Sequence, residues 1–329
     1  MKLYNGDCLE IMKNIPDDSI DLILCDLPYG TIKGLQPSKY KKKFDYNTDW
    51  DIRLDTESLF REYERILRPK GTIILFSQEP YTNQLRAFEC QYIKFSQSAI
   101  WKKDAFGNFL GCKNSLVSYY EDISIFRANE NSIGSSELKS YFKKVKDYIN
   151  LSLKQIENIV GHRKLSHCFL VSDNNTQFRL CVEEAYNDLI NIFHIDQMDG
   201  FLSYSTLKDM RPKSLKPQTF NLEENENFIG NIFEYNRETK RYHPTQKPVA
   251  LLERLIKIYS NEGETVLDNC MGSGSTGVAC LNTSRKFIGI EKDENYFQIA
   301  KERLEETNSK LEQSNKEISE EQSQIEAFF

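Results

Sequence analysis

Short runs of apolar residues recur near both ends of this chain, and most are followed by a turn or a helical pattern. Such runs occupy residues 20–25, 72–76, 264–268 and 285–291. Runs of this length and aliphatic content are typical of buried strands in a parallel sheet. Because amphipathic helical spacing lies between them, as at 58–67, we expect alternating strands and helices, which is the doubly wound α/β class.

The rest of the chain completes this picture. We expect a short strand at 2–4, a helix at 8–13, and an antiparallel edge pair of strands at 95–101 and 122–126. Residues 129–239 are polar and lack runs typical of buried strands, and their spacing predicts helices at 138–149, 153–160 and 183–193. One sheet is therefore expected to form from both ends of the chain, with a mainly helical insertion between them. The two helices around Gly161 fit a helix-turn-helix or a plain helical subdomain.

Composition indicates the cellular compartment in which the protein is expected. Its eight cysteines form no C-x-x-C pair, and no apolar run approaches the length that spans a membrane. We therefore expect reduced thiols and a cytoplasmic, nucleoid-associated protein without a membrane partner. The net charge of −6 is unusual for a DNA-binding protein, but the acidic stretch from residue 301 onward carries much of it. Lysines cluster instead at 39–43 and 139–146.

The stretch Asp26-Leu27-Pro28-Tyr29 follows the first buried strand. The carboxyl ends of such strands are where open α/β sheets bind ligands. Asp26 offers a carboxylate, Leu27 and Pro28 offer carbonyl groups, and Tyr29 offers an aromatic ring. Acceptors beside a flat ring suit a planar group that carries an exocyclic amine. The plainer interpretation is a turn that ends a strand.

A second candidate site follows the strand at 264–268. The glycine-rich turn at 269–277 leads from this strand into a helix, and its backbone could approach a ligand closely. Gly272, Gly274 and Gly277 satisfy G-x-G-x-x-G, and Glu291 ends the next strand, where an acid suits a ribose diol. Taken alone, this pattern leaves an NAD-dependent dehydrogenase open.

Three motifs together resemble those of the β-class DNA amino-methyltransferases. They are Asp26 to Tyr29, then His243-Pro244-Thr245-Gln246-Lys247-Pro248, and then Asp268 to Gly274. The chain departs from the family pattern at Leu27, where a proline is usual, and at Cys270, where a phenylalanine is usual. The resemblance implies a circularly permuted, Rossmann-like methyltransferase sheet. Its parts are a catalytic half at 1–128, a target-recognition insertion at 129–239, a half that binds S-adenosylmethionine (SAM) at 240–303, and an acidic tail at 304–329.

The resemblance also implies an activity: transfer of a methyl group from SAM to adenine N6 in double-stranded DNA, with no metal. The implied catalytic residues are Asp26, Leu27, Pro28 and Tyr29. The implied cofactor-binding residues are Asp7, Asp26, Thr245, Lys247, Asp268, Met271, Gly272, Ser273, Gly274, Ser275 and Glu291. Cytosine N4 methylation, the dehydrogenase and an inactive DNA-binding module remain alternatives. The sequence leaves open whether the protein is a monomer or a homodimer. It also leaves open whether a restriction nuclease is paired with it.

Other residues have less settled roles. His243 is a candidate base, although packing or capping explains such a histidine equally simply. Asp7 fits both a helix N-cap and a cofactor ligand. Suitable side chains for reading bases in the insertion are Arg163, Lys164, Asn174, Asn175, Gln177 and Arg179.

The last eight residues resemble the peptide that binds a sliding clamp (PCNA), Q-x-x-[ILM]-x-x-[FY]-[FY]. Gln322, Ile325, Phe328 and Phe329 occupy its four specified positions. They follow a tail rich in Glu, Gln, Ser and Asn, for which we expect a frayed helix or disorder. Apolar residues recur there every seven residues, which supports a coiled coil only weakly.

Overall fold

The computed structural model describes most of the chain. The described residues are 1–30, 51–90, 92–106, 116–128, 136–161, 165, 168–169, 178, 180–210, 218–240, 242–243 and 245–326. Within them, eight strands form one sheet in the order β1-β8-β7-β2-β3-β5-β4-β6. The strands are β1 (Lys2–Asn5), β2 (Ile20–Asp26), β3 (Leu67–Ser77), β4 (Ile93–Lys102), β5 (Tyr120–Ala128), β6 (Ile232–Glu234), β7 (Thr265–Asp268) and β8 (Lys286–Glu291).

The two halves of the chain meet at β2. This strand pairs in parallel with β3 on one side and with β7 on the other. Its residues 20–25 are buried because helices cover both faces of the sheet, which explains the uninterrupted apolar run. β5 runs antiparallel to both β3 and β4. The expected α/β sheet, built from both ends of the chain, is confirmed.

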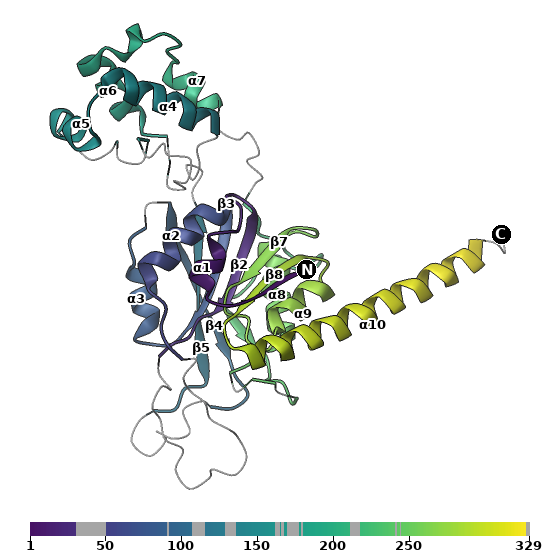
Figure 1. Ribbon diagram of the computed structural model, residues 1–329. Coiled ribbons are helices and arrows are strands. Elements are labelled where there is room, and N and C mark those ends of the chain that lie inside the picture. The colour runs from purple at the N-terminus through teal and green to yellow at the C-terminus, as the bar shows by residue number, and fades with distance from the viewer. Residues whose placement is uncertain are drawn as a thin grey trace.

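Helices form a layer on each face of the sheet (Figure 1). One layer contains α1 (Cys8–Met12), α2 (Thr56–Ile66) and α3 (Tyr81–Ala87), and the other contains α8 (Val249–Tyr259), α9 (Ser275–Asn282) and the start of α10 (Glu294–Glu326). α2 begins where the Asp55 side chain accepts a hydrogen bond from Ser58 N at 2.9 Å. It buries Leu59, Phe60 and Tyr63 at helical spacing, as the sequence predicts.

The insertion is helical and has its own hydrophobic core. It contains α4 (Ser136–Ile149), α5 (Leu153–Val160), α6 (Glu183–Phe193), a short 3-10 helix η2 (Ile195–Gln197) and α7 (Tyr204–Asp209). Phe142 and Tyr186 are fully buried in this core, and α5 ends at Gly161 with φ +82°. Figure 1 shows these helices grouped apart from the sheet. The structure therefore contains a separately packed helical subdomain, as expected.

The insertion joins the sheet at the end opposite Asp26. Asp26 pairs with Phe76 near the end of β3, whereas Arg127, just before the insertion, pairs with Thr72. Arg127 also donates a hydrogen bond to Thr219 O at 3.2 Å, so both attachment points of the insertion lie close together. This placement follows from the antiparallel pairing of β5 with β3, whereas the sequence predicted only the antiparallel pairing of β5 with β4.

Five elements differ from the expectations. β6 pairs with β4 and forms the sheet edge, so the β4–β5 pair is internal, and β3 begins at Leu67 rather than at 72. α3 and α7 were not expected, because both helices are short. The tail forms the single long helix α10, whose fully buried Ala300 and Leu304 pack on the sheet domain. Further along, ion pairs such as Lys310–Glu306 at 2.7 Å support a solvated helix.

None of the helices in the described part of the chain combines the length and apolar composition that a bilayer crossing needs. Seven cysteines among the described residues carry free thiols. Several expectations concern positions outside the described residues: the lysine cluster at 39–43, the six candidate base-reading side chains, and Phe328 and Phe329.

Candidate active site

The catalytic turn begins where β2 ends, in the middle of the sheet. The Asp26 side chain is 24% exposed and both of its oxygens have partners. Oδ1 accepts a hydrogen bond from the Tyr29 hydroxyl at 2.6 Å, and Oδ2 pairs with the ammonium group of Lys247. Burial raises the pKa of the Asp26 carboxyl, while Lys247 acts in the opposite direction. Leu27 is buried among apolar side chains, so its side chain serves packing.

Two residues that the sequence analysis missed hold this turn in place. Asp51 is 1% exposed and accepts a hydrogen bond from Gly30 N at 2.7 Å. Arg53 donates from Nε to the Tyr29 carbonyl oxygen at 2.6 Å. Gly30 has φ +68°, a conformation that glycine adopts at little cost. No local pattern marks Asp51 or Arg53, since both act on a turn distant in the sequence.

The glycine loop between β7 and α9 forms another wall of the site. Gly272 has φ +51° and donates from its backbone N–H to Glu291 Oε2 at 2.9 Å. The other oxygen of Glu291 accepts from Asp293 N at 2.7 Å. Burial raises the pKa of the Glu291 carboxyl, and these two backbone donors oppose that rise. Glu291 therefore stabilises the loop and also faces the cavity.

Asp268 ends β7 and is 3% exposed. Its oxygens accept hydrogen bonds from Thr276 Oγ1 at 2.6 Å and Cys270 N at 3.1 Å. Burial raises the pKa of this carboxyl to about 7. Asp268 thus connects the end of β7 to the first turn of α9.

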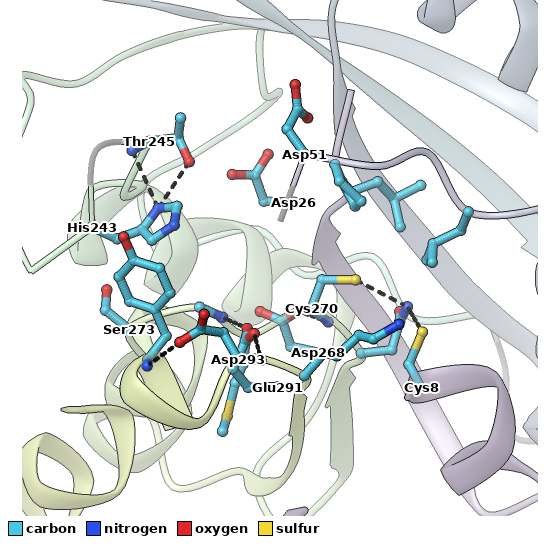
Figure 2. A pocket seen from close by; sticks show the side chains of 18 of the residues that line it. Cys8, Asp26, Asp51, His243, Thr245, Asp268, Cys270, Ser273, Glu291 and Asp293 are labelled. Atoms are coloured by element: carbon cyan, nitrogen blue, oxygen red, sulfur yellow. Dashed lines mark hydrogen bonds between the residues drawn. The ribbon is translucent and has the colours of Figure 1, made fainter. Parts of the chain in front are cut away.

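The catalytic turn and the glycine loop line one cavity of about 560 Å³. Figure 2 shows Asp26 and Asp51 toward one side of it in this view, and Asp268, Glu291 and Asp293 toward another. The predicted catalytic and cofactor residues line this cavity, with the exception of Gly274. A Cβ added at Gly274 would meet Ala300 Cβ at 3.1 Å, so this glycine allows α10 to pack closely instead. Gly277 likewise lies against Leu304 and Phe287.

The residues present fit a bound SAM molecule. A Cβ at Gly272 would have no neighbour nearer than His243 Cγ at 4.0 Å, so the loop backbone faces open space there. Gln246 is 8% exposed, and its Nε2 has no hydrogen-bond partner among the described residues. A buried amide donor without a partner is costly, and an acceptor group on a ligand would satisfy it. Carboxylates and backbone groups at the ends of β7 and β8 complete a polar set suited to a nucleoside.

Lys247 lines the cavity, and its expected role in cofactor binding stays a prediction. The resemblance implied a role in cofactor binding, but the ammonium group turns toward the carboxylates of Asp26 and Glu121, the latter at 3.0 Å. Thr245 lines the cavity, and its hydroxyl lies 3.0 Å from His243 Nδ1. Burial, followed by the charge of Lys247, lowers the pKa of His243 to about 4. His243 is therefore neutral at physiological pH and packs edge-on against Tyr296.

Asp7 is the N-cap of α1, and its expected role as a cofactor ligand stays a prediction. It lines the cavity, and its side chain also accepts from Leu9 N at 3.0 Å as the N-cap of α1. Its second oxygen pairs with Lys292 at 3.0 Å.

Comparison with known proteins identifies the family. A family model described as DNA methylase matches residues 20–302, which include the catalytic turn, the insertion and the glycine loop. The chain belongs to this DNA methylase family. It is 50% identical over 326 residues to the Type II methyltransferase M2.DpnII of Streptococcus pneumoniae, covering 94% of this chain and 91% of that protein.

More distant relatives carry related names. The DNA adenine methyltransferase YhdJ of Escherichia coli K12 is 25% identical over 311 residues, covering 92% of this chain and 82% of that protein. The crystal structure of the M1.HpyAVI–SAM complex matches with a TM-score of 0.51 at 20% identity, covering 92% of this chain and 99% of that chain. That likeness confirms the fold.

Membership in the DNA methylase family confirms the expected enzyme class, a DNA methyltransferase whose methyl donor is SAM. The NAD-dependent dehydrogenase that G-x-G-x-x-G left open is wrong, since the chain belongs to the DNA methylase family. Tyr63, which was not expected at the site, donates a buried hydrogen bond to Asn269 Oδ1 at 2.6 Å and so supports the glycine loop from α2.

Proposed function

We propose that this DNA methylase transfers the methyl group of SAM to the N6 atom of adenine in double-stranded DNA. The observation that carries the proposal is that Asp26, Tyr29 and the glycine loop line one cavity. Aspartate at the first position of the catalytic motif accompanies adenine methylation in the enzymes that the chain resembles. The name of the Escherichia coli relative, a DNA adenine methyltransferase, also supports adenine.

In this proposal the target base leaves the double helix and enters the cavity beside Asp26. Tyr29 stacks on the base, and Asp26 together with the Leu27 or Pro28 carbonyl accepts the N–H groups of its amine. These bonds direct the nitrogen lone pair at the methyl carbon. SAM, when bound, supplies that carbon on a sulfonium sulfur, which keeps the electron pair of the broken S–C bond. The surplus proton of the methylated nitrogen passes to Asp26 and then to water.

Nucleoside analysis tests the proposal directly. Plasmid DNA lacking the modification is incubated with the purified protein and SAM, digested, and analysed by mass spectrometry. We expect N6-methyladenine from the wild type and none from Asp26→Asn, while calorimetry shows SAM binding by both proteins. N4-methylcytosine as the product would reverse the choice of base, and turnover by Asp26→Asn would refute the role of its carboxylate.

We propose that the helical insertion takes part in target recognition. Of the expected range 129–239, residues 232–234 form β6 of the sheet, so the proposal concerns the helical part before residue 218. It has its own core, and its attachment points lie close together, so a short Gly-Ser linker can replace residues 130–217. We expect this shortened chain to bind SAM and to lose sequence-specific methylation. Specific methylation by the shortened chain would refute a recognition role for the insertion.

We propose that the last eight residues bind a sliding clamp. Residues up to Glu326 continue α10, which extends away from the sheet in Figure 1, and the specified Phe328 and Phe329 follow it. A helical extension that ends in two aromatic residues suits an apolar groove on a partner. Purified clamp should bind the full chain and not a chain lacking residues 322–329, and equal binding would refute this. The oligomeric state, including a homodimer, is open to measurement by sedimentation of the same samples.

A further inference from the structure

A second carboxylate lies directly behind the catalytic turn. Glu121 is at the start of β5 and is 8% exposed. Because β5 runs antiparallel to β3, its first residues lie at the same end of the sheet as Asp26, and Glu121 pairs in register with Trp101 of β4. It belongs to none of the motifs that identify the family.

Glu121 has three partners. Its Oε1 lies 2.6 Å from Lys103 Nζ, and its Oε2 lies 3.0 Å from Lys247 Nζ and 3.2 Å from the Tyr29 hydroxyl. Lys247 and Tyr29 are also the two partners of Asp26. Asp26 and Glu121 therefore share the same ammonium group and the same hydroxyl, and Lys103 balances the second negative charge.

In this arrangement Lys247 and the Tyr29 hydroxyl compete with the target amine for Asp26. The target amine has to donate hydrogen bonds to Asp26, yet Lys247 and Tyr29 already occupy both of its oxygens. Lys247 is 4% exposed, and a buried ammonium group cannot leave one carboxylate without another partner. An ammonium group left beside the amine would also oppose the positive charge that the nitrogen gains as it takes the methyl group.

We propose that Glu121 is a positioning residue for methyl transfer: it holds Lys247 and the Tyr29 hydroxyl when the target amine takes their places on Asp26. This inference rests on the proposed function. The pair Lys247–Glu121 forms without a large movement, since their atoms already lie 3.0 Å apart. The ion pair with Lys103 keeps Glu121 charged throughout.

Glu121→Gln tests the inference, because glutamine has the same shape and no charge. Lys247 then has only Asp26 as an anionic partner and competes with the amine. We expect the single-turnover rate at saturating DNA to fall about tenfold or more, with SAM affinity within about twofold of wild type. Glu234→Gln is the matched control: Glu234 of β6 pairs with Lys102 of the neighbouring strand β4 at 2.9 Å, and both side chains are exposed. It should leave the rate unchanged.

A second variant separates positioning from a structural role. In Glu121→Gln/Lys247→Met the competing ammonium group is gone, and the charges of Asp26 and Lys103 balance. We expect the single-turnover rate of the double variant to be about tenfold higher than that of Glu121→Gln. Purely structural damage would instead make the double variant slower than Glu121→Gln. If Glu121→Gln loses SAM binding, the same comparison is made with Glu121→Asp and Glu121→Asp/Lys247→Met.

The outcomes are distinct. An unchanged rate in Glu121→Gln, or a double variant no faster than its parent, overturns the inference while wild-type methylation stands. Absence of any DNA methylation by the wild type overturns the proposed function itself.

Discussion

The hydroxyl group of Tyr29 lies 2.6 Å from Oδ1 of Asp26, so the aromatic ring proposed to stack on the target base also covers the proposed acceptor. The ring is partly buried, and the ammonium group of Lys247 lies 5.8 Å from its centre. The Tyr29 hydroxyl therefore competes with the target amine for the Asp26 carboxylate, while the ring itself is available for stacking.

This relationship predicts different effects for two substitutions of Tyr29. Tyr29→Phe keeps the ring and removes one competitor for Asp26, so we expect kcat within a few-fold of wild type. Tyr29→Ala removes the stacking surface, which is worth about 1–3 kcal/mol per base and corresponds to roughly a tenfold to hundredfold loss in kcat/KM. Steady-state kinetics on one oligonucleotide measures both. Equal losses in the two variants would show that the hydroxyl, not the ring, matters.

We predict that a substitution of Gly272 lowers the affinity for SAM. Alanine there would adopt φ +51° and project its methyl group into the cavity near His243. We expect Gly272→Ala to raise the Kd for SAM about tenfold, measured by calorimetry. Gly263→Ala is the control, since Gly263 has φ +75° with no atom within 4 Å of an added Cβ, and it does not line the cavity. Both variants should lose about 1 kcal/mol of stability, but the control should bind SAM normally.

Arg303 links α10 to the glycine loop, and we predict that α10 supports this loop through it. Its Nη1 donates to Ser273 O at 3.1 Å and lies 2.9 Å from Ser275 Oγ. Arg303→Met keeps the apolar stem and removes these donors, so the loop should become less ordered and the Kd for SAM should rise about fivefold to tenfold. Lys310→Met, further along the same helix and paired only with Glu306 in an exposed position, should have no effect. Normal SAM binding by Arg303→Met would contradict this role.

The lowered pKa of His243 leads us to predict that the stability of the protein depends on pH. Burial and the charge of Lys247 lower its pKa from 6.5 to about 4 in the folded protein. The unfolded chain therefore binds a proton at higher pH than the folded chain, and stability falls as the pH drops from 6.5 toward 4. From pH 7.5 to 5 this group alone should cost about 2 kcal/mol of unfolding free energy.

Urea unfolding of wild type and His243→Asn at both pH values measures this cost. Asparagine cannot take up a proton, and its Oδ1 can accept from Thr245 as Nδ1 does. The variant should therefore lose about 2 kcal/mol less than the wild type on acidification. Identical losses would show that the imidazole is protonated in the folded state.

Much of the fold and part of the site followed from local sequence. The apolar run before Asp26 marks the central strand, since only a strand covered on both faces excludes polar residues from both of its sides. The turn at Gly272 was also predictable, because a backbone near a ligand with positive φ favours glycine. α5 and α6 match their expected bounds, as amphipathic spacing directly reports which side of a helix is buried.

The remaining features depend on the order and direction of the strands. Glu121 reaches Asp26, and the insertion attaches at the opposite end, because β5 is antiparallel. Alternation along β5 reports burial but not direction, so neither fact can be read from the pattern. The partners of Asp51 and Lys247 also depend on the tertiary structure: Asp51 accepts from the Gly30 N–H, and Lys247 pairs with the carboxylates of Asp26 and Glu121, groups that only folding brings near them. The sequence alone determined the catalytic turn, the glycine loop and the elements that carry them. Only the tertiary structure decided which charged side chains meet behind Asp26, because these side chains come from segments that lie far apart in the sequence.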